Sequence, residues 1–347
     1  MSARRLYLDE GFGESRGVVT LDGRPERLLI QRDGDNPSQT LGARLVARVR
    51  RTERAQALAF LDLGGGPDGI LNITRESGPL AEGAVVEVEI KAESRGDKGA
   101  ALRLIGPAEG VPRLLQPPPT LEQRLRAFDH QAEFLTGRPA RGVADVAQEE
   151  VVQTRFRTPG GGDLAVEQTR ALISIDVDLG NRPGGNDKRA ARAANLSALA
   201  VAARVLRLKG LGGLVVIDFV GKGHDGPVLL SAARAAFGPD NPGVAFGQIS
   251  RFGTLELTIP RRARPALDIL AADGGVPTAL TQALMLVRAL EREAAADGGG
   301  RFEGIAPSEV VEAAGPALAL LNARSGGRLT LRPDASLGRL QQEVFRL

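Results

Sequence analysis

Two apolar segments that each lead into an aspartate constrain the fold of this chain more than any other feature. Residues 171–175 precede Asp176, and residues 213–217 precede Asp218. Between them the apolar side chains of residues 196–206 recur at helical spacing, after a possible cap at Asn186 or Asp187. A strand, a helix and a strand of these lengths predict a right-handed crossover with parallel strands. We therefore expect an α/β unit with both aspartates at the same edge of its sheet.

The chemistry of this pair follows from its charge. Two carboxylates held together repel each other unless a cation lies between them or one is protonated. A divalent ion with oxygen ligands resolves the repulsion and assists phosphoryl chemistry. Asp178, two residues past Asp176, is a candidate third oxygen ligand and catalytic residue. The alternative is that each aspartate only caps the turn after its strand.

The composition narrows the kinds of site that the chain can form. It has 347 residues and no cysteine, and His130 and His224 are its only histidines, which excludes disulfides and argues against a zinc site. Any metal must be held by oxygen, which favours Mg²⁺, with Mn²⁺ as a second choice. The formal net charge of +3 permits nucleic-acid binding without requiring it. Because no segment resembles a signal sequence or a membrane span, we expect a cytoplasmic protein without a membrane partner.

Residues 41–104 show the alternation and glycine-rich turns of a small β-barrel or sandwich. Arg95 and Lys98 lie in a basic, glycine-containing loop that could follow a nucleic-acid backbone. Phe60 could stack on a base. An ordinary solvated hairpin and a core phenylalanine are the alternatives.

The rest of the chain divides at prolines. Pro112 and residues 117–119 indicate a joint, after which Thr120 and Gln123 form a capping-box pattern that begins a helix. After Pro260 a smaller α/β unit follows, with helices expected near residues 278–295 and after residue 308 and a last strand at residues 328–331.

A turn at residues 248–253 carries the remaining candidate site residues. Arg251 could reach a phosphate, and Phe252 could stack on a base, since both follow a predicted strand. The alternative is a hairpin corner with Phe252 in the core.

Together these segments resemble the ribonuclease E/G family. The resemblance rests on residues 169–178, 195–196, 211–219 and 249–253, with further similarity at residues 59–62, 95–102, 286–288 and 304–307. It implies a multidomain α/β protein with an OB-fold RNA-binding barrel, a DNase I-like catalytic core and a small C-terminal α/β domain. The expected boundaries are residues 1–38 for an N-terminal β segment that packs on the core, 39–112 for the barrel, 113–150 for a linker and helix, 151–262 for the core and 263–347 for the small domain.

The resemblance also implies a function. Asp176 and Asp218 match the family's two magnesium-binding aspartates, and the implied reaction is endonucleolytic hydrolysis of single-stranded RNA in RNA processing or decay, leaving a 5′-phosphate and a 3′-hydroxyl. Phe60, Arg95 and Lys98 match RNA-contacting positions. Without cysteines, no zinc-linked tetramer is expected, so a monomer or weak homodimer is the natural form.

Several residues depart from the family pattern. Asp178 stands where asparagine is usual, Arg170 replaces a glutamate, and Lys188 and Arg189 occupy helix positions that are often acidic. Ile70 replaces an RNA-facing aromatic residue, and the segment before the core, which senses the 5′ end in the family, is short. An RNA-binding protein with weakened or lost catalysis is therefore the main alternative. A nucleotide-sugar transferase that uses Asp176 and Asp178 ranks last, because it leaves Asp218 and Arg251 unexplained.

Overall fold

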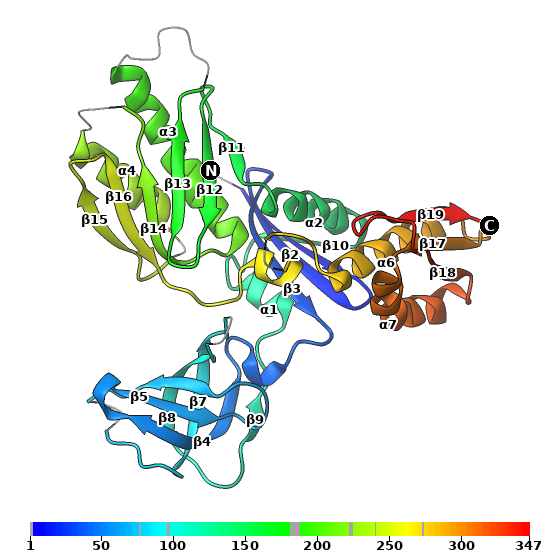
Figure 1. Ribbon diagram of the computed structural model, residues 1–347, viewed down its shortest axis with the longest axis horizontal. Coiled ribbons are helices and arrows are strands. Elements are labelled where there is room, and N and C mark those ends of the chain that lie inside the picture. The colour runs from blue at the N-terminus through cyan, green and yellow to red at the C-terminus, as the bar shows by residue number, and fades with distance from the viewer. Residues whose placement is uncertain are drawn as a thin grey trace.

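In the part of the chain that the structure describes, the protein is a mixed α/β molecule with four sheets and associated helices (Figure 1). The computed structural model describes residues 3–75, 78–95, 98–180, 188–221, 225–239, 241–272 and 274–347. In Figure 1 the sheet that contains β13 and β14 lies at upper left with α3 and α4, a β-barrel lies at lower left, and the C-terminal unit lies at right. No helix in these described ranges is long and apolar enough to cross a membrane.

The first sheet joins the N-terminal strands to a strand more than one hundred residues later. Its order is β10-β1-β2-β3, with β10 parallel to β1 and the other pairs antiparallel; the strands are β1 (Arg4–Glu10), β2 (Glu14–Leu21), β3 (Arg24–Arg32) and β10 (Glu133–Thr136). Alternation gives it two apolar faces. The helix α2 (Gly137–Val151) packs on the face that contains Tyr7 and Val18, and α1 (Leu121–Arg126) packs on the face that contains Leu6 and Val19. Thr120 and Gln123 form the predicted capping box of α1.

The barrel is built from five strands that close on themselves. Its strands are β4 (Arg44–Glu53), β5 (Leu58–Asp62), β6 (Gly69–Asn72), β7 (Val85–Ala92) and β8 (Ala101–Pro107). The ring closes because β4 pairs with both β5 and β7, and β9 (Arg113–Gln116) adds to β4 outside the ring. Two 3-10 turns, Pro37–Gln39 and Arg54–Gln56, flank β4. The predicted small barrel is thus present, and its topology is OB-like.

The central sheet carries both aspartates. Its order is β11-β12-β13-β14-β16-β15, from the strands β11 (Arg155–Arg157), β12 (Asp163–Gln168), β13 (Ile173–Asp178), β14 (Gly213–Asp218), β15 (Ala245–Ile249) and β16 (Thr254–Ile259). β13 and β14 pair in parallel, as predicted, through a crossover that contains α3 (Lys188–Lys209). The helix α4 (Gly226–Phe237) packs beside α3 on the same core. The expected caps of α3, Asn186 and Asp187, lie outside the described residues.

The described part of the C-terminal unit contains a three-stranded sheet and three helices. It contains α5 (Ala266–Leu270), α6 (Ala279–Ala296), β17 (Phe302–Ala306), α7 (Ser308–Ser325), β18 (Leu329–Pro333) and β19 (Glu343–Arg346). The sequence predicted that the strand corresponding to β18 would be the last one. That prediction is wrong, because β19 follows it and pairs antiparallel with β17.

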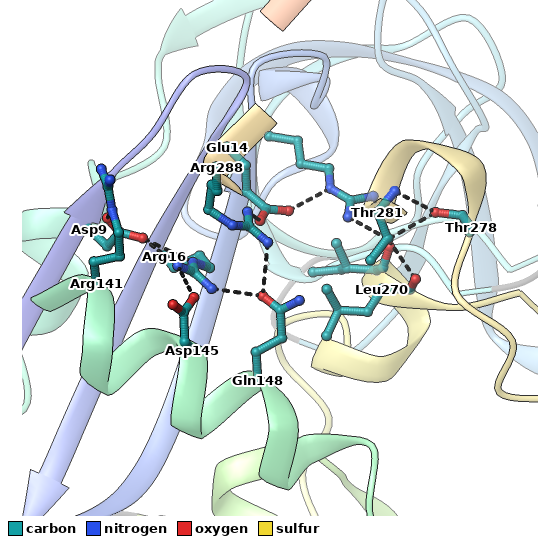
Figure 2. A network of polar contacts seen from close by, with 12 residues as sticks. Asp9, Glu14, Arg16, Arg141, Asp145, Gln148, Leu270, Thr278, Thr281 and Arg288 are labelled. Carbon is teal, nitrogen blue, oxygen red and sulfur yellow. Dashed lines mark hydrogen bonds and ion pairs between the residues drawn. The ribbon is translucent and has the colours of Figure 1, made fainter. Parts of the chain in front are cut away.

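A buried polar network joins the N-terminal sheet to α2 and α6 (Figure 2). The Arg16 side chain is 1% exposed, and its Nη2 lies 2.6 Å from an Asp9 carboxylate oxygen and 2.8 Å from one of Asp145. Glu14 Oε1 accepts from Arg288 Nη1 at 2.7 Å, and its Oε2 accepts from Arg32 Nε at 2.9 Å. Each buried charge therefore has an opposite charge beside it, as burial requires.

Candidate functional site

The two aspartates are direct neighbours across adjacent strands. Asp176 of β13 stands in register with Asp218 of β14. The same row continues to Ala165 and Arg155 on one side and to Thr254 on the other. The sequence prediction that these segments bring the two carboxylates together is therefore confirmed.

Both carboxylates lie on a face of the sheet that the helices leave uncovered. Ile175, Val177 and Ile217 are buried in the core beside α3 and α4, whereas Asp176 and Asp218, which alternate with them, are exposed. The prediction placed Asp176 at the end of its strand. That placement is wrong, because β13 continues to residue 178. The pair therefore faces outward near the carboxyl ends of the strands, and an extended ligand can reach it along the open sheet face.

Asp178 shares this face but is not in the same row. It pairs in register with Asp163 of β12, and its Oδ1 accepts the backbone N–H of Gly180 at 2.9 Å. That contact is the turn-capping role which the sequence left open. It occupies one oxygen and leaves the second carboxylate oxygen available.

The surroundings of Asp176 disfavour its charged form. Loss of hydration raises the pKa of Asp176 above its ordinary value, and the negative charges of Asp218, Asp178 and Asp163 raise it further. Arg155 opposes this effect from the end of the row. A group whose charged form is disfavoured by like charges is stabilised in that form by a cation.

The donor set fits a hard divalent cation with few protein ligands. Within the described ranges there is no group of three or more histidine, cysteine, aspartate or glutamate side chains arranged to hold a metal ion. Two carboxylates are enough for Mg²⁺, which keeps several waters and uses one or two carboxylates together with substrate phosphates. A closed zinc site would need four ligands, which this face does not offer.

The turn between β15 and β16 lies beside the aspartate row. Its residue Gly253 accepts the backbone N–H of Phe219, next to Asp218, at 3.1 Å. The Phe252 side chain is 76% exposed, so it is not the core residue of the alternative reading. The guanidinium of Arg251 lies 4.6 Å from its ring centroid, and both face solvent.

Asn195 of α3 holds the chain where it leaves β14. The asparagine is 1% exposed. Its Nδ2 donates to the Val220 carbonyl at 3.0 Å and its Oδ1 accepts from the Val220 N–H at 3.1 Å. In the sequence, Asn195 was noted only among the residues that resemble a known family, without a role of its own. This two-point contact fixes the backbone two residues after Asp218, which makes Asn195 a positioning residue.

Two hydroxyl groups near the row had no place in the prediction. Ser250 Oγ and Thr254 Oγ1 lie 2.8 Å apart, and Thr254 pairs in register with Asp218. Their signal in the sequence was a serine within the predicted turn and a threonine directly after it. They brace the turn that presents Phe252.

The barrel residues lie on a separate unit. Phe60 of β5 pairs with Ile70 and Arg51, and the Arg51 guanidinium lies 3.9 Å from its ring centroid. Lys98 is exposed, but the Nε of Arg95 lies 3.4 Å from a carboxylate oxygen of Asp268. Arg95 is therefore engaged in joining the barrel to the rest of the protein.

The comparisons with known proteins agree on one family. Residues 139–262 match the model of the Ribonuclease E/G family. The chain is 30% identical over 215 residues to Ribonuclease E of Haemophilus influenzae, covering 57% of this chain and 23% of that protein. It is 31% identical over 148 residues to the chloroplastic Ribonuclease E/G-like protein of Arabidopsis thaliana, covering 41% and 14% respectively. Against Ribonuclease G of Escherichia coli it is 27% identical over 194 residues, covering 52% and 40%. The chain thus spans less than half the length of each of these relatives.

Proposed function

The chain belongs to the ribonuclease E/G family, and on that premise we propose that it is a magnesium-dependent endoribonuclease acting on single-stranded RNA. The observation that carries the proposal is the register pair of Asp176 and Asp218 on an open sheet face. The products would carry a 5′-phosphate and a 3′-hydroxyl. We infer that the central sheet with α3 and α4 is the family's DNase I-like core.

Asp176 and Asp218 are the residues that would hold the ion. A bound Mg²⁺, or Mn²⁺ in its place, supplies charge neutralisation at the phosphate and makes water a better nucleophile. Asp178 would keep its free oxygen for orienting water by a hydrogen bond. Its neighbouring negative charge would also favour cation binding.

Residues of the nearby turn would bind the RNA itself. Arg251 is exposed and would neutralise a phosphate, and Phe252 would stack on an unpaired base. Stacking requires an accessible aromatic face, and this ring has one.

We propose that the barrel adds RNA-binding surface through Phe60 and Lys98. Phe60 stands in a row with Arg51 and Ile70. An aromatic ring beside a cation suits a nucleotide, since the base can stack and the phosphate can pair with the guanidinium. Arg95 would contribute less than Lys98, because its ion pair with Asp268 competes with phosphate.

A second candidate is an RNA-binding protein of this family with little catalysis. It is favoured by Asp178, which stands where the family usually has asparagine and commits one carboxylate oxygen to the Gly180 turn. Lys188 and Arg189 at the start of α3 also add positive charge after the acidic strand. This candidate keeps RNA binding but excludes magnesium-dependent cleavage.

Cleavage of a fluorescent, AU-rich single-stranded RNA tests the proposal. The unmodified protein should cut in Mg²⁺ and stop in EDTA, and Asp218→Asn should abolish cutting while fluorescence anisotropy still reports RNA binding. Glu256→Gln is the matched control, because Glu256 is exposed on β16 of the same sheet but pairs with Val216 rather than with either aspartate.

The outcomes separate the two candidates. Cleavage by Glu256→Gln but not by Asp218→Asn supports the nuclease. Equal cleavage by Asp218→Asn and the unmodified protein would refute the assigned site. Tight RNA binding without cleavage by any version favours the second candidate.

A further inference from the structure

Two arginines stand on the outermost strand of the central sheet, on the face that carries the aspartates. That strand is β11, at one edge of the sheet (Figure 1). Phe156 in its middle is buried in the core, so Arg155 and Arg157 on either side of it face the opposite way and are exposed. Arg155 lies in the row that leads through β12 to Asp176 and Asp218. We call Arg155 and Arg157 the arginine pair.

The backbone of β11 is fixed, which gives the arginine pair a defined place. The ring of Phe156 packs in the core, and the Lys209 ammonium lies 5.4 Å from its centroid. Just before the strand, the Thr154 carbonyl accepts the backbone N–H of Val166 at 2.8 Å. The two arginine side chains therefore leave a rigid edge of the sheet at points roughly 7 Å apart along the strand.

Both arginines are available to an external anion. Arg155 Nη2 lies 3.5 Å from Asp163 Oδ1, and the Arg155 side chain is 71% exposed. An exposed ion pair of this length contributes little, so a phosphate can replace it. The Arg157 side chain forms no hydrogen bond or ion pair within the described ranges, although Asp163 stands opposite it in register. Two cations on one strand face repel each other, and a phosphate beside them relieves that repulsion.

The other charges of this face restrict where an RNA backbone can lie. One row nearer the amino ends of β13 and β14, Glu167 and Glu256 stand at the two ends. Both are exposed and repel phosphates. A backbone that approached the aspartates along β14 would pass between them. A backbone that follows the aspartate row instead meets Arg155 at one end and the turn with Arg251 beyond the other, so this path is favoured.

We propose that the arginine pair binds RNA phosphates on one side of the scissile bond, while Arg251 and Phe252 hold the strand on the other side. This inference rests on the proposed function, because it takes the aspartate pair as the place of cleavage. The RNA would cross the sheet at right angles to β13 and β14. The backbone at Arg155 lies two strands from Asp176, roughly 10 Å away, so Arg155 contacts a neighbouring phosphate rather than the scissile one. Cleavage would therefore require unpaired nucleotides on both sides of the cut.

The salt dependence of RNA binding tests the arginine pair without chemistry. Fluorescence anisotropy in EDTA, at several KCl concentrations, gives the Kd for a single-stranded AU-rich RNA. Arg155→Gln and Arg157→Gln should each weaken binding by roughly threefold to tenfold. Each should also reduce the slope of the logarithm of Kd against the logarithm of the KCl concentration by about 0.7, the value for one phosphate contact on a single strand. Arg155→Lys should keep the slope, because the charge remains.

Arg170→Gln is the matched control. Arg170 is exposed on the same sheet, but it lies in the turn before β13, at the opposite end of that strand from the aspartates. Its substitution should leave both the affinity and the slope unchanged. Because every one of these variants removes one exposed positive charge, a general effect of net charge would appear in all of them equally. The circular dichroism spectrum should be the same throughout, since none of these side chains is buried.

A cleavage arm locates the contacted phosphates. Once the cut site is mapped in Mg²⁺, RNAs are compared that carry one neutral methylphosphonate at successive positions around it, with the adjacent 2′-hydroxyl methylated. With the unmodified protein, a neutral link on either side of the cut should raise KM more than it lowers kcat. The double variant of Arg155→Gln and Arg157→Gln should lose this response on one side only. A role of Arg155 limited to the charge of Asp176 would instead change kcat and its pH profile with the KCl slope intact, which would overturn the inference.

The remaining outcomes separate this inference from the nuclease. Unchanged affinity and slope in the double variant would overturn the inference even if the unmodified protein cuts RNA. Equal losses in Arg170→Gln would overturn it as well. A reduced slope in the double variant, together with no cleavage by any version, would support the arginine pair as an RNA-binding site and refute the nuclease.

Discussion

Neutralising Glu14 should destabilise this protein more than removing either of the arginines that it holds. The Glu14 side chain is 1% exposed, and its two oxygens pair separately with Arg288 and Arg32. Burial and the nearby charge of Arg16 lower the pKa of Arg288. In Glu14→Gln these buried cations lose their shared counter-charge, which should cost about 3–5 kcal/mol of unfolding free energy.

The arginine variant should behave differently. Arg288→Met removes a cation that Arg16 already repels, and it leaves Glu14 paired with Arg32. Its cost should therefore be less than half that of Glu14→Gln. In the double variant with Glu14→Gln and Arg288→Met, the uncompensated charge of Arg288 is gone. The loss of unfolding free energy should therefore be about 1–3 kcal/mol smaller than the sum of the two single losses.

Urea unfolding followed by far-ultraviolet circular dichroism measures these differences. Glu303→Gln is the control, because its ion pair with Arg332 lies at the surface and should contribute at most about 1 kcal/mol. The reasoning fails if Glu14→Gln costs no more than Glu303→Gln. Strict additivity of Glu14→Gln and Arg288→Met would equally refute it.

Three other predictions concern the central sheet. The pKa of Lys209 is lowered to about 8 from 10.5, so between these pH values only the unfolded chain keeps the proton. Stability in urea should therefore rise with pH through that window, by at most about 3 kcal/mol, and Lys209→Met should flatten the rise. Phe252→Ala should weaken single-stranded RNA binding by about 1–3 kcal/mol in anisotropy titrations without changing stability, and an unchanged affinity would exclude stacking there. Asn195→Ala leaves the Val220 backbone unpaired, so it should cost about 1–3 kcal/mol and slow cleavage; unchanged unfolding would contradict that.

The local pattern was sufficient for the aspartate pair. Apolar runs before Asp176 and Asp218, with a helix between them, fix parallel strands, and parallel strands of similar length bring their carboxyl ends together. The pattern did not reveal that Asp176 faces outward from within its strand. That depends on how far β13 pairs with β12, through Asp163 to Asp178, which an isolated strand pattern cannot show.

Long-range contacts account for most of what the sequence did not predict. Arg95 has the charge and loop setting of a phosphate-binding residue, but a carboxylate 173 positions later, on Asp268, is its partner. Alternation and spacing describe a residue's own element, whereas these contacts depend on how separate elements are arranged.

The buried network of Figure 2 has a consequence for the order in which the protein can be completed during synthesis. Glu14 is translated early, but its partner Arg288 follows 274 residues later. β1 likewise lacks its neighbour β10 until the whole barrel has been translated. A nascent chain therefore carries Glu14 with only Arg32 as its partner, and an open strand edge, while the barrel can already close. Ribosome-bound chains that stop before α6 should consequently expose the N-terminal sheet to proteases and chaperones. Once α6 has emerged, the sheet should be protected from proteases and should no longer bind chaperones.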